Sequence, residues 1–213
     1  YVSERASEWL GRAGNFISLH LGNGASATAI RAGQSVDTSM GMTPLEGLVM
    51  GTRSGDIDPS LLAFIGQKEN LSPAETEALL NKKSGLLGLS GSHSDMQQLL
   101  EHAAQGEEAS QRAIDVFCYR AKQYIGAYLA VLGDVDALIF TGGIGENAAA
   151  VRAQICAGLE PLGIALDPEA NPQGKTRLVI SRAESRIKVL VIPTDEELMI
   201  ALDTHRLIKR NWF

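Results

Sequence analysis

Three strand-forming segments that follow one another at very short spacing constrain the fold of this chain most. They are "NFISLHL", "ASATAIR" and "QSVDTSM", at residues 15–21, 25–31 and 34–40. The turns between them, "GNG" and "AG", are typical of tight hairpins. The pattern therefore predicts a three-stranded antiparallel meander.

Helices and strands alternate along the rest of the chain. We expect helices at residues 1–10, 59–66, 72–81, from residue 94, at 107–132, after the glycines of 142–145, and from a cap at Thr194 to residue 208. We expect strands at "ALIF" (137–140), 163–166, 178–180 and "KVLVI" (188–192), and a turn at 85–91. Ser72, Pro73 and Glu75 form the signature of a capping box. This order predicts an α/β fold with a mixed sheet.

Composition limits the classes of function. The formal net charge of −6 and the pI near 5.3 argue against a nucleic-acid-binding protein. No apolar run reaches the roughly 20 residues that a membrane-spanning helix needs. Cys118 and Cys156 lie in apolar helical patterns without metal-binding or redox spacing, so we expect buried thiols and a cytoplasmic protein.

The stretch "FTGGIGENA", residues 140–148, predicts a nucleotide site. Gly143, Gly145 and Ala148 match a dinucleotide-binding fingerprint, and Asp167 follows about twenty residues later. Dinucleotide-binding domains, however, carry this fingerprint in their first turn, whereas here it follows the meander and several helices. The order of elements therefore favours another nucleotide over NAD.

Two further segments carry candidate phosphate ligands. Backbone N–H groups at Gly22, Asn23 and Gly24 could form an anion-binding concavity beside His20, although a plain hairpin explains the same residues. Arg53 lies in "GTRSGDIDP", within a loop at residues 37–59 long enough to suggest a function. Its guanidinium suits phosphate or carboxylate, and the alternative is an ion pair with a neighbouring aspartate.

The acids of "IPTDEEL", residues 192–198, could reach Mg²⁺ or could simply favour the start of a helix. No G-x-x-x-x-G-K-[ST] sequence occurs, so a P-loop is excluded. Backbone donors, a cation and an acid are nevertheless the parts that phosphoryl transfer needs.

The blocks "SLHLGNGAS", "DTSMGMTPLEGLVMGTRSGDIDP", "SGLLGLSG", "FTGGIGENA" and "IPTDEELMIA" together resemble the acetate kinase family. The resemblance implies an actin/hexokinase-type ATPase domain with a ribonuclease H-like core and helices on both faces of the sheet. It also implies reversible ATP-dependent phosphorylation of acetate to acetyl phosphate, with Mg²⁺, and a homodimer that binds neither nucleic acid nor a membrane. Propionate and butyrate kinases share these blocks and stay open as alternatives. More remote alternatives are a non-catalytic nucleotide-binding module and an NAD-binding oxidoreductase.

The resemblance also implies roles for single residues. Gly22, Asn23 and Gly24 would wrap the ATP phosphates, with His20 near the transferred group and Arg53 stabilising the transferring phosphoryl as catalytic residues. The implied adenosine-binding residues are Asp95, Gly143, Ile144, Gly145, Glu146 and Asn147. Glu196 matches the family's magnesium-associated glutamate, and Glu197 is its neighbouring alternative.

The chain departs from the family pattern in two respects. Gln97 stands where the family commonly carries an arginine that contacts the base. The family's N-terminal domain has no counterpart here, so we expect residues 1–14 to be the remnant of a helix from that region. Residues 15–213 would form the C-terminal nucleotide-binding domain, with a helical insertion around residues 59–105. The resemblance therefore predicts a fragment that is inactive alone.

Overall fold

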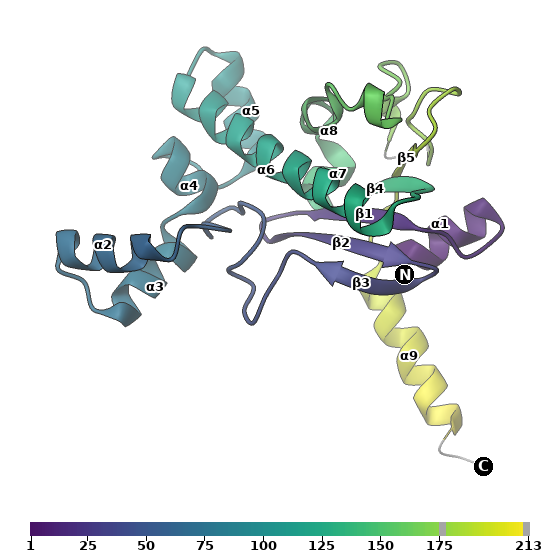
Figure 1. Ribbon diagram of the computed structural model, residues 1–213, viewed down its shortest axis with the longest axis horizontal. Coiled ribbons are helices and arrows are strands. Elements are labelled where there is room, and N and C mark those ends of the chain that lie inside the picture. Colours follow the sequence, from purple (N-terminus) through teal and green to yellow (C-terminus); the bar gives the residue numbers. More distant parts are fainter. Residues whose placement is uncertain (175–177, 211–213) are drawn as a thin grey trace.

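A five-stranded mixed sheet organises the molecule (Figure 1). The computed structural model describes residues 1–174 and 178–210, apart from the side chains of Glu196 and Arg210. The strands are β1 (Phe16–Leu21), β2 (Ala25–Arg31), β3 (Gln34–Thr38), β4 (Ala137–Thr141) and β5 (Lys188–Val191), in the spatial order β3-β2-β1-β4-β5. The pairs β1–β2 and β2–β3 are antiparallel, and β1–β4 and β4–β5 are parallel. The predicted meander and mixed sheet are confirmed.

Helices occupy both faces of this sheet and extend beyond it (Figure 1). They are α1 (Val2–Leu10), α2 (Ser60–Glu69), α3 (Pro73–Lys82), α4 (Gly85–Ser90), α5 (Met96–Ala104), α6 (Glu108–Leu132), α7 (Gly142–Asn147), α8 (Ala149–Cys156) and α9 (Glu196–Arg210), with short 3₁₀ turns at Glu160–Leu162 and Asn171–Gln173. Helix α6 packs on the sheet and also contacts α4 and α5. Helices α2 and α3 form an arm to one side, and α9 projects away from the sheet.

Alternation along β1 divides the core between the two faces of the sheet. Ile17, Leu19 and Leu21 join the larger cluster, which includes the buried side of α6. Phe16 points the other way and joins a smaller cluster that contains Ala6 of α1. Because both faces of β1 and β4 are covered, nearly all residues of these central strands are buried and most are apolar, as in parallel strands generally.

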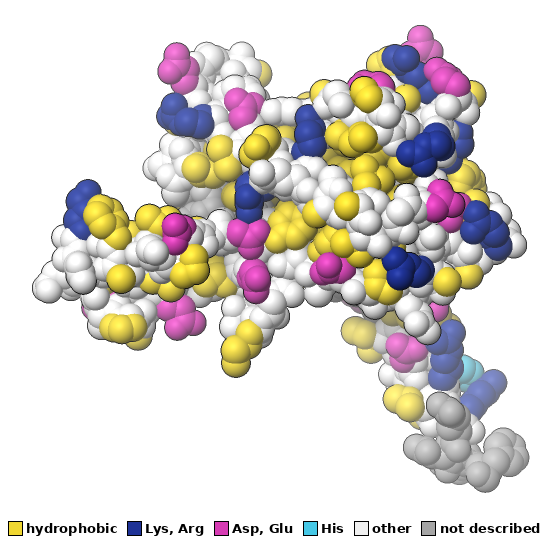
Figure 2. Space-filling view, in the orientation of Figure 1, with side chains coloured by type: hydrophobic (Ala, Val, Ile, Leu, Met, Phe, Trp, Pro, Cys, Tyr) yellow, Lys and Arg dark blue, Asp and Glu magenta, His cyan; other side chains and the backbone are white. Residues whose placement is uncertain are grey.

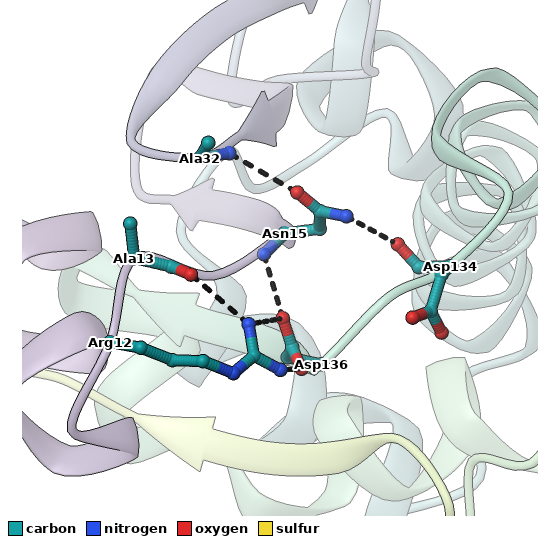
Figure 3. Close-up of polar contacts among 6 residues, drawn as sticks. All are labelled: Arg12, Ala13, Asn15, Ala32, Asp134 and Asp136. Atoms are coloured by element: carbon teal, nitrogen blue, oxygen red, sulfur yellow. Dashed lines mark hydrogen bonds and ion pairs between the residues drawn. The ribbon is translucent and has the colours of Figure 1, made fainter.

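A polar joint fixes the end of the sheet where β1 and β4 begin (Figure 3). Asp136 accepts the backbone N–H of Asn15 at 2.8 Å and pairs with the guanidinium of Arg12. The Asn15 side chain accepts the N–H of Ala32 at 3.1 Å and donates to the carbonyl of Asp134 at 3.0 Å. Three chain segments are therefore held in register at this end: the α1–β1 link, the β2–β3 turn and the α6–β4 link.

Two local predictions, the capping box and the buried thiols, are confirmed. Ser72 and Glu75 form the predicted capping box at the start of α3. Cys118 and Cys156 are free and buried, and burial raises the pKa of each thiol to about 12. No helix in the described part of the chain is both long enough and apolar enough to cross a membrane.

Other local predictions are wrong. The expected turn at residues 85–91 is helix α4, which begins at Gly85 with a left-handed φ of 60°. The expected strands at residues 163–166 and 178–180 form only isolated bridges, such as Val179 with Leu190. At the start of α9, Asp195 rather than Thr194 accepts the N–H of Leu198, at 3.0 Å.

Candidate active site at the carboxyl ends of the central strands

The carboxylate of Asp56 links the long loop at residues 39–59 to helix α6. Asp56 accepts the N–H of Gly47 at 2.7 Å through Oδ1, and it accepts both Arg120 Nη2 and the Tyr124 hydroxyl at 2.7 Å through Oδ2. Arg120 and Tyr124 belong to α6. Burial, followed by donation to Asp56, raises the pKa of the Tyr124 hydroxyl, so Tyr124 remains a donor at neutral pH. Asp56 thereby ties both ends of the segment 47–56 to the sheet-covering helix.

Arg53 lies within this tied segment and is half-buried. Its Nη1 lies 3.7 Å from the sulfur of Met50, and a Cβ added at Gly24 would lie 3.6 Å from the same nitrogen. Among the described residues Arg53 forms no ion pair, because Asp56 pairs with Arg120 instead. The alternative of a structural ion pair with Asp56 or Asp58 is therefore wrong, and the guanidinium lies beside the β1–β2 turn.

The β1–β2 turn meets the loop through a close backbone approach at Gly51. The N–H of Gly51 donates to the carbonyl of Asn23 at 3.0 Å. A Cβ on Gly51 would lie 2.2 Å from Asn23 Oδ1 and 3.2 Å from the carbonyl oxygen of Ser94, so a larger residue would have to displace the Asn23 side chain. Within the turn, Gly22 donates its N–H to the carbonyl of Gly24 at 3.0 Å. Any anion cradle here must therefore use the N–H groups of Asn23 and Gly24.

A cleft of about 560 Å³ opens where this turn, the start of α5 and helix α7 converge. The residues that line it are Gly22, Asn23, Ser94, Asp95, Met96, Gln97, Leu100, Gly143, Ile144, Asn147 and Ala148. Most of the nucleotide-binding residues predicted from the sequence thus share one cleft. Asp95 also caps α5 by accepting the N–H of Gln98 at 3.1 Å. Gln97 lines the cleft as well, and its amide donates to Glu101 at 3.0 Å.

The predicted glycine turn after β4 is a helix, α7, whose two sides differ. Gly142 has a φ of 77°, and a Cβ there would lie 2.8 Å from the carbonyl oxygen of Leu21, so the chain requires glycine. Gly143 is exposed, with open space where a Cβ would be. Gly145 is buried against Phe140, and neither Gly145 nor Glu146 lines the cleft. Only the Gly143, Ile144 and Asn147 side of α7 faces a potential ligand.

The buried side chain of Arg152 supports α7, a role that no motif in the sequence predicts. Its side chain is 1% exposed and donates to the carbonyls of Gly145 and Glu146 at 2.8 and 2.9 Å, and to Asn171 Oδ1 at 2.9 Å. Burial lowers the pKa of this guanidinium. Among the described residues no carboxylate pairs with Arg152. Backbone carbonyls at the end of α7 therefore act as acceptors for a buried cation.

A second cavity, of about 490 Å³, lies on the α1 and α9 side of the sheet. Ser18, His20, Thr141, Thr194 and Asp195 contribute its polar lining. His20 is the register partner of Thr141, whose buried hydroxyl has no hydrogen-bond partner in the described structure. A buried polar atom of this kind commonly marks a place for a water or a ligand atom. His20 thus lines this second cavity, and neither of the predicted catalytic residues, His20 and Arg53, lines the nucleotide cleft.

The acids predicted to serve a metal lie at the start of α9. The Glu196 side chain lies outside the described residues, while Asp195 and Glu197 are exposed. In the described part of the chain, no group of three or more His, Cys, Asp or Glu side chains could hold a metal ion. The few carboxylates at the start of α9 fit Mg²⁺, because in kinases that ion uses one or two carboxylates, waters and the phosphates of the substrate.

Comparisons with known proteins show the family to which the chain belongs. The sequence profile of the acetokinase family matches residues 1–202. The chain is 61% identical over 196 residues to an acetate kinase of Solibacter usitatus, covering 91% of this chain and 47% of that protein. It is 54% identical to an acetate kinase of Dictyoglomus thermophilum, covering 98% of this chain and 53% of that protein.

Solved structures give the same result. The acetate kinase of Porphyromonas gingivalis superimposes with a TM-score of 0.94 at 47% identity, over 98% of this chain and 53% of that one. A propionate kinase from Francisella tularensis gives a TM-score of 0.90 at 46% identity, over 94% of this chain and 52% of that one. This chain therefore belongs to the acetokinase family, has its actin/hexokinase-like fold, and spans about half the length of the relatives it matches.

Proposed function

We propose that this chain is the nucleotide-binding half of an ATP-dependent kinase that transfers phosphate to acetate. The observation that carries the proposal is the single cleft that unites the β1–β2 turn, Asp95 and the exposed side of α7, with Arg53 beside the turn. Residues 15–213 would form the nucleotide-binding domain, with the insertion around residues 59–105. The acyl site would need a second domain, which the relatives have the length to supply.

The proposed reaction is in-line transfer of the ATP γ-phosphoryl group to a carboxylate oxygen. Such transfer depends on positioning and on stabilisation of the charge that spreads over the phosphoryl oxygens. Asn23 and Gly24 would donate backbone N–H groups to the phosphates, and Arg53 would present its planar donors to the transferring group. His20, Gly145 and Glu146 do not line the cleft, so they would support it from its rim or from the protein interior beneath it. When bound, Mg²⁺ would neutralise phosphate charge from the Glu196 side.

Propionate kinase activity is the alternative that the comparisons leave open, since a propionate kinase is among the structural relatives. Gln97 stands where the family commonly carries an arginine that contacts the base, so we expect this chain to be less selective for adenine. Two free, buried thiols support a reducing compartment such as the cytoplasm.

The direct test of this proposal uses the chain alone. We expect the purified 213-residue chain to bind ADP more tightly with Mg²⁺ than with EDTA in calorimetric titrations. In a hydroxamate assay it should make no acetyl phosphate above background, because two-domain kinases complete their site when a cleft closes. Absence of ADP binding would refute the nucleotide site, and turnover near that of a complete relative would refute the need for a second domain.

The two sides of α7 give a matched pair of variants. Gly143→Val should fill open space in the cleft and weaken ADP binding at least about tenfold, or 1.4 kcal/mol, with little change in melting temperature. Gly145→Ala should keep near-normal affinity, because its Cβ would lie 3.4 Å from the carbonyl carbon of Phe140, an ordinary contact. Unchanged affinity in Gly143→Val would show that this side of α7 does not meet the nucleotide.

Arg53 can be tested in a complete two-domain enzyme that carries this half. Arg53→Lys should leave nucleotide binding and melting temperature close to those of the parent. It should lower kcat/KM on the order of 10³-fold, because a lysine cannot reproduce the fork that serves a transferring phosphoryl group. Near-normal kinetics would remove Arg53 from the catalytic residues.

We also propose that the chain forms a homodimer, which the family resemblance implies. Helix α2 supports this, since none of its residues is buried and Phe64 is 59% exposed; Figure 2 shows hydrophobic side chains among charged and other residues on the arm formed by α2 and α3. Phe64→Glu should weaken dimerisation measured by light scattering, whereas Leu162→Glu, at a similarly exposed leucine elsewhere, should not. A parent chain that is monomeric would contradict the proposed dimer. A dimer that Phe64→Glu does not weaken would show that α2 is not part of the interface.

A further inference from the structure

The carboxylate of Glu146 links two segments of the site, the start of α7 and the residues that precede α9. Its Oε1 accepts the backbone N–H of Gly142 at 3.1 Å and the backbone N–H of Thr194 at 3.1 Å. Gly142 opens α7, whose outer side lines the nucleotide cleft. Thr194 precedes Asp195, the cap of α9, and the acids at positions 196 and 197.

These two segments need such a link because of the sheet. Strands β4 and β5 are parallel neighbours, and their last described backbone bond runs from the N–H of Ile192 to the carbonyl of Phe140, at 3.0 Å. Beyond that bond, one segment turns into α7 and the other runs towards α9. Among the residues that the structure describes, no hydrogen bond other than that of Glu146 connects residues 142–148 with residues 193–195.

The position of Glu146 differs from that of a nucleotide contact. The residue is half-buried and is not part of the cleft lining, whereas its neighbour Asn147 is. An ionised carboxylate that accepts two backbone N–H groups forms charge-assisted bonds, which are roughly twice as strong as neutral ones. Glu146 is therefore suited to hold two backbone segments at a fixed separation.

We infer that Glu146 is a positioning residue that fixes the acidic segment at residues 194–197 relative to the nucleotide helix α7. The inference rests on the proposed function. Cooperation between a metal ion and a nucleotide is a coupling free energy, and it requires that the groups serving each be held in one geometry. Loss of the link should therefore reduce the gain in ADP affinity that Mg²⁺ provides, while the affinity for metal-free ADP, which the cleft lining sets, stays nearly constant.

The experiment measures ADP binding to the 213-residue chain by calorimetry, once with Mg²⁺ and once with EDTA. The readout is the ratio of the two affinities. Glu146→Ala should lower this ratio about tenfold, the lower limit typical when a residue that orients a metal ligand is removed. Glu146→Gln should give an intermediate ratio, because the amide keeps an acceptor oxygen but loses the charge. The EDTA affinity should change less than about twofold in both variants.

Asp136→Asn provides the matched control. Asp136 also accepts a backbone N–H from a distant segment, that of Asn15 at 2.8 Å, but it precedes β4 at the opposite end of the sheet (Figure 3). This variant should melt at a lower temperature with an unchanged affinity ratio. Amide hydrogen exchange gives a second readout without ligand: the Thr194 amide should exchange faster in Glu146→Ala and not in Asp136→Asn.

Three outcomes would overturn the inference. An equal loss of affinity with Mg²⁺ and with EDTA would show that Glu146 acts on α7 alone. An unchanged affinity ratio in Glu146→Ala, even with faster exchange at Thr194, would show that the link has no consequence for binding. A parent chain whose ADP affinity is the same with and without Mg²⁺ would show this as well. A parent chain that binds no ADP at all would overturn the proposed function itself, which separates the two failures.

Discussion

The parallel pairing of β1 with β4 is the constraint on which the site depends. Because parallel strands end at the same edge of a sheet, the β1–β2 turn, helix α7 and the segment after β5 are delivered to one place. The register makes this specific, since His20 stands opposite Thr141 and Phe140 stands opposite Val191. The polar joint around Asp136 fixes the starting ends of the same two strands, so the positions of their carboxyl ends follow.

The loop that carries Arg53 does not belong to the sheet and needs its own attachment. Asp56 provides it through donors from Gly47, Arg120 and Tyr124. Glycines then bring the loop close to its neighbours: Gly51 meets the β1–β2 turn, and Gly85 meets the carbonyls of Met50 and Arg53. A segment without regular structure thus gains a defined conformation from the buried side chains of Leu48, Val49 and Met50, from the Asp56 carboxylate and from glycines in close contact with their neighbours.

Local signals in the sequence were sufficient for the parts of the fold that depend on neighbours in the chain. The hairpins of residues 16–38 and the capping box at Ser72 and Glu75 are examples. Helix α4 was missed because it begins at a glycine with positive φ that packs under a distant loop. Residues 163–166 and 178–180 were predicted as strands because they are apolar, yet they form only single bridges, at Ile164, Leu166 and Val179.

The same distinction applies to the site. Motifs identified the segments that meet at the cleft, but they could not tell Gly143, which faces the cleft, from Gly145, which faces the core. The side of a short helix that is buried depends on the strands beneath it. Glu146 and Arg152 act on partners up to 48 residues away along the chain, and no local pattern announces such contacts.

The buried guanidinium of Arg152 has a consequence for the order in which the chain becomes able to bind a nucleotide. A buried cation without acceptors is costly, and two of its acceptors come from Asn171, which follows it by 19 residues. A nascent chain that has emerged from the ribosome only as far as α8 already contains the whole of α7. It still lacks Asn171, so Arg152 cannot yet have all the hydrogen-bond acceptors that it has beneath α7 in the folded protein. Maturation of the nucleotide cleft during synthesis therefore waits for a segment that never touches the nucleotide.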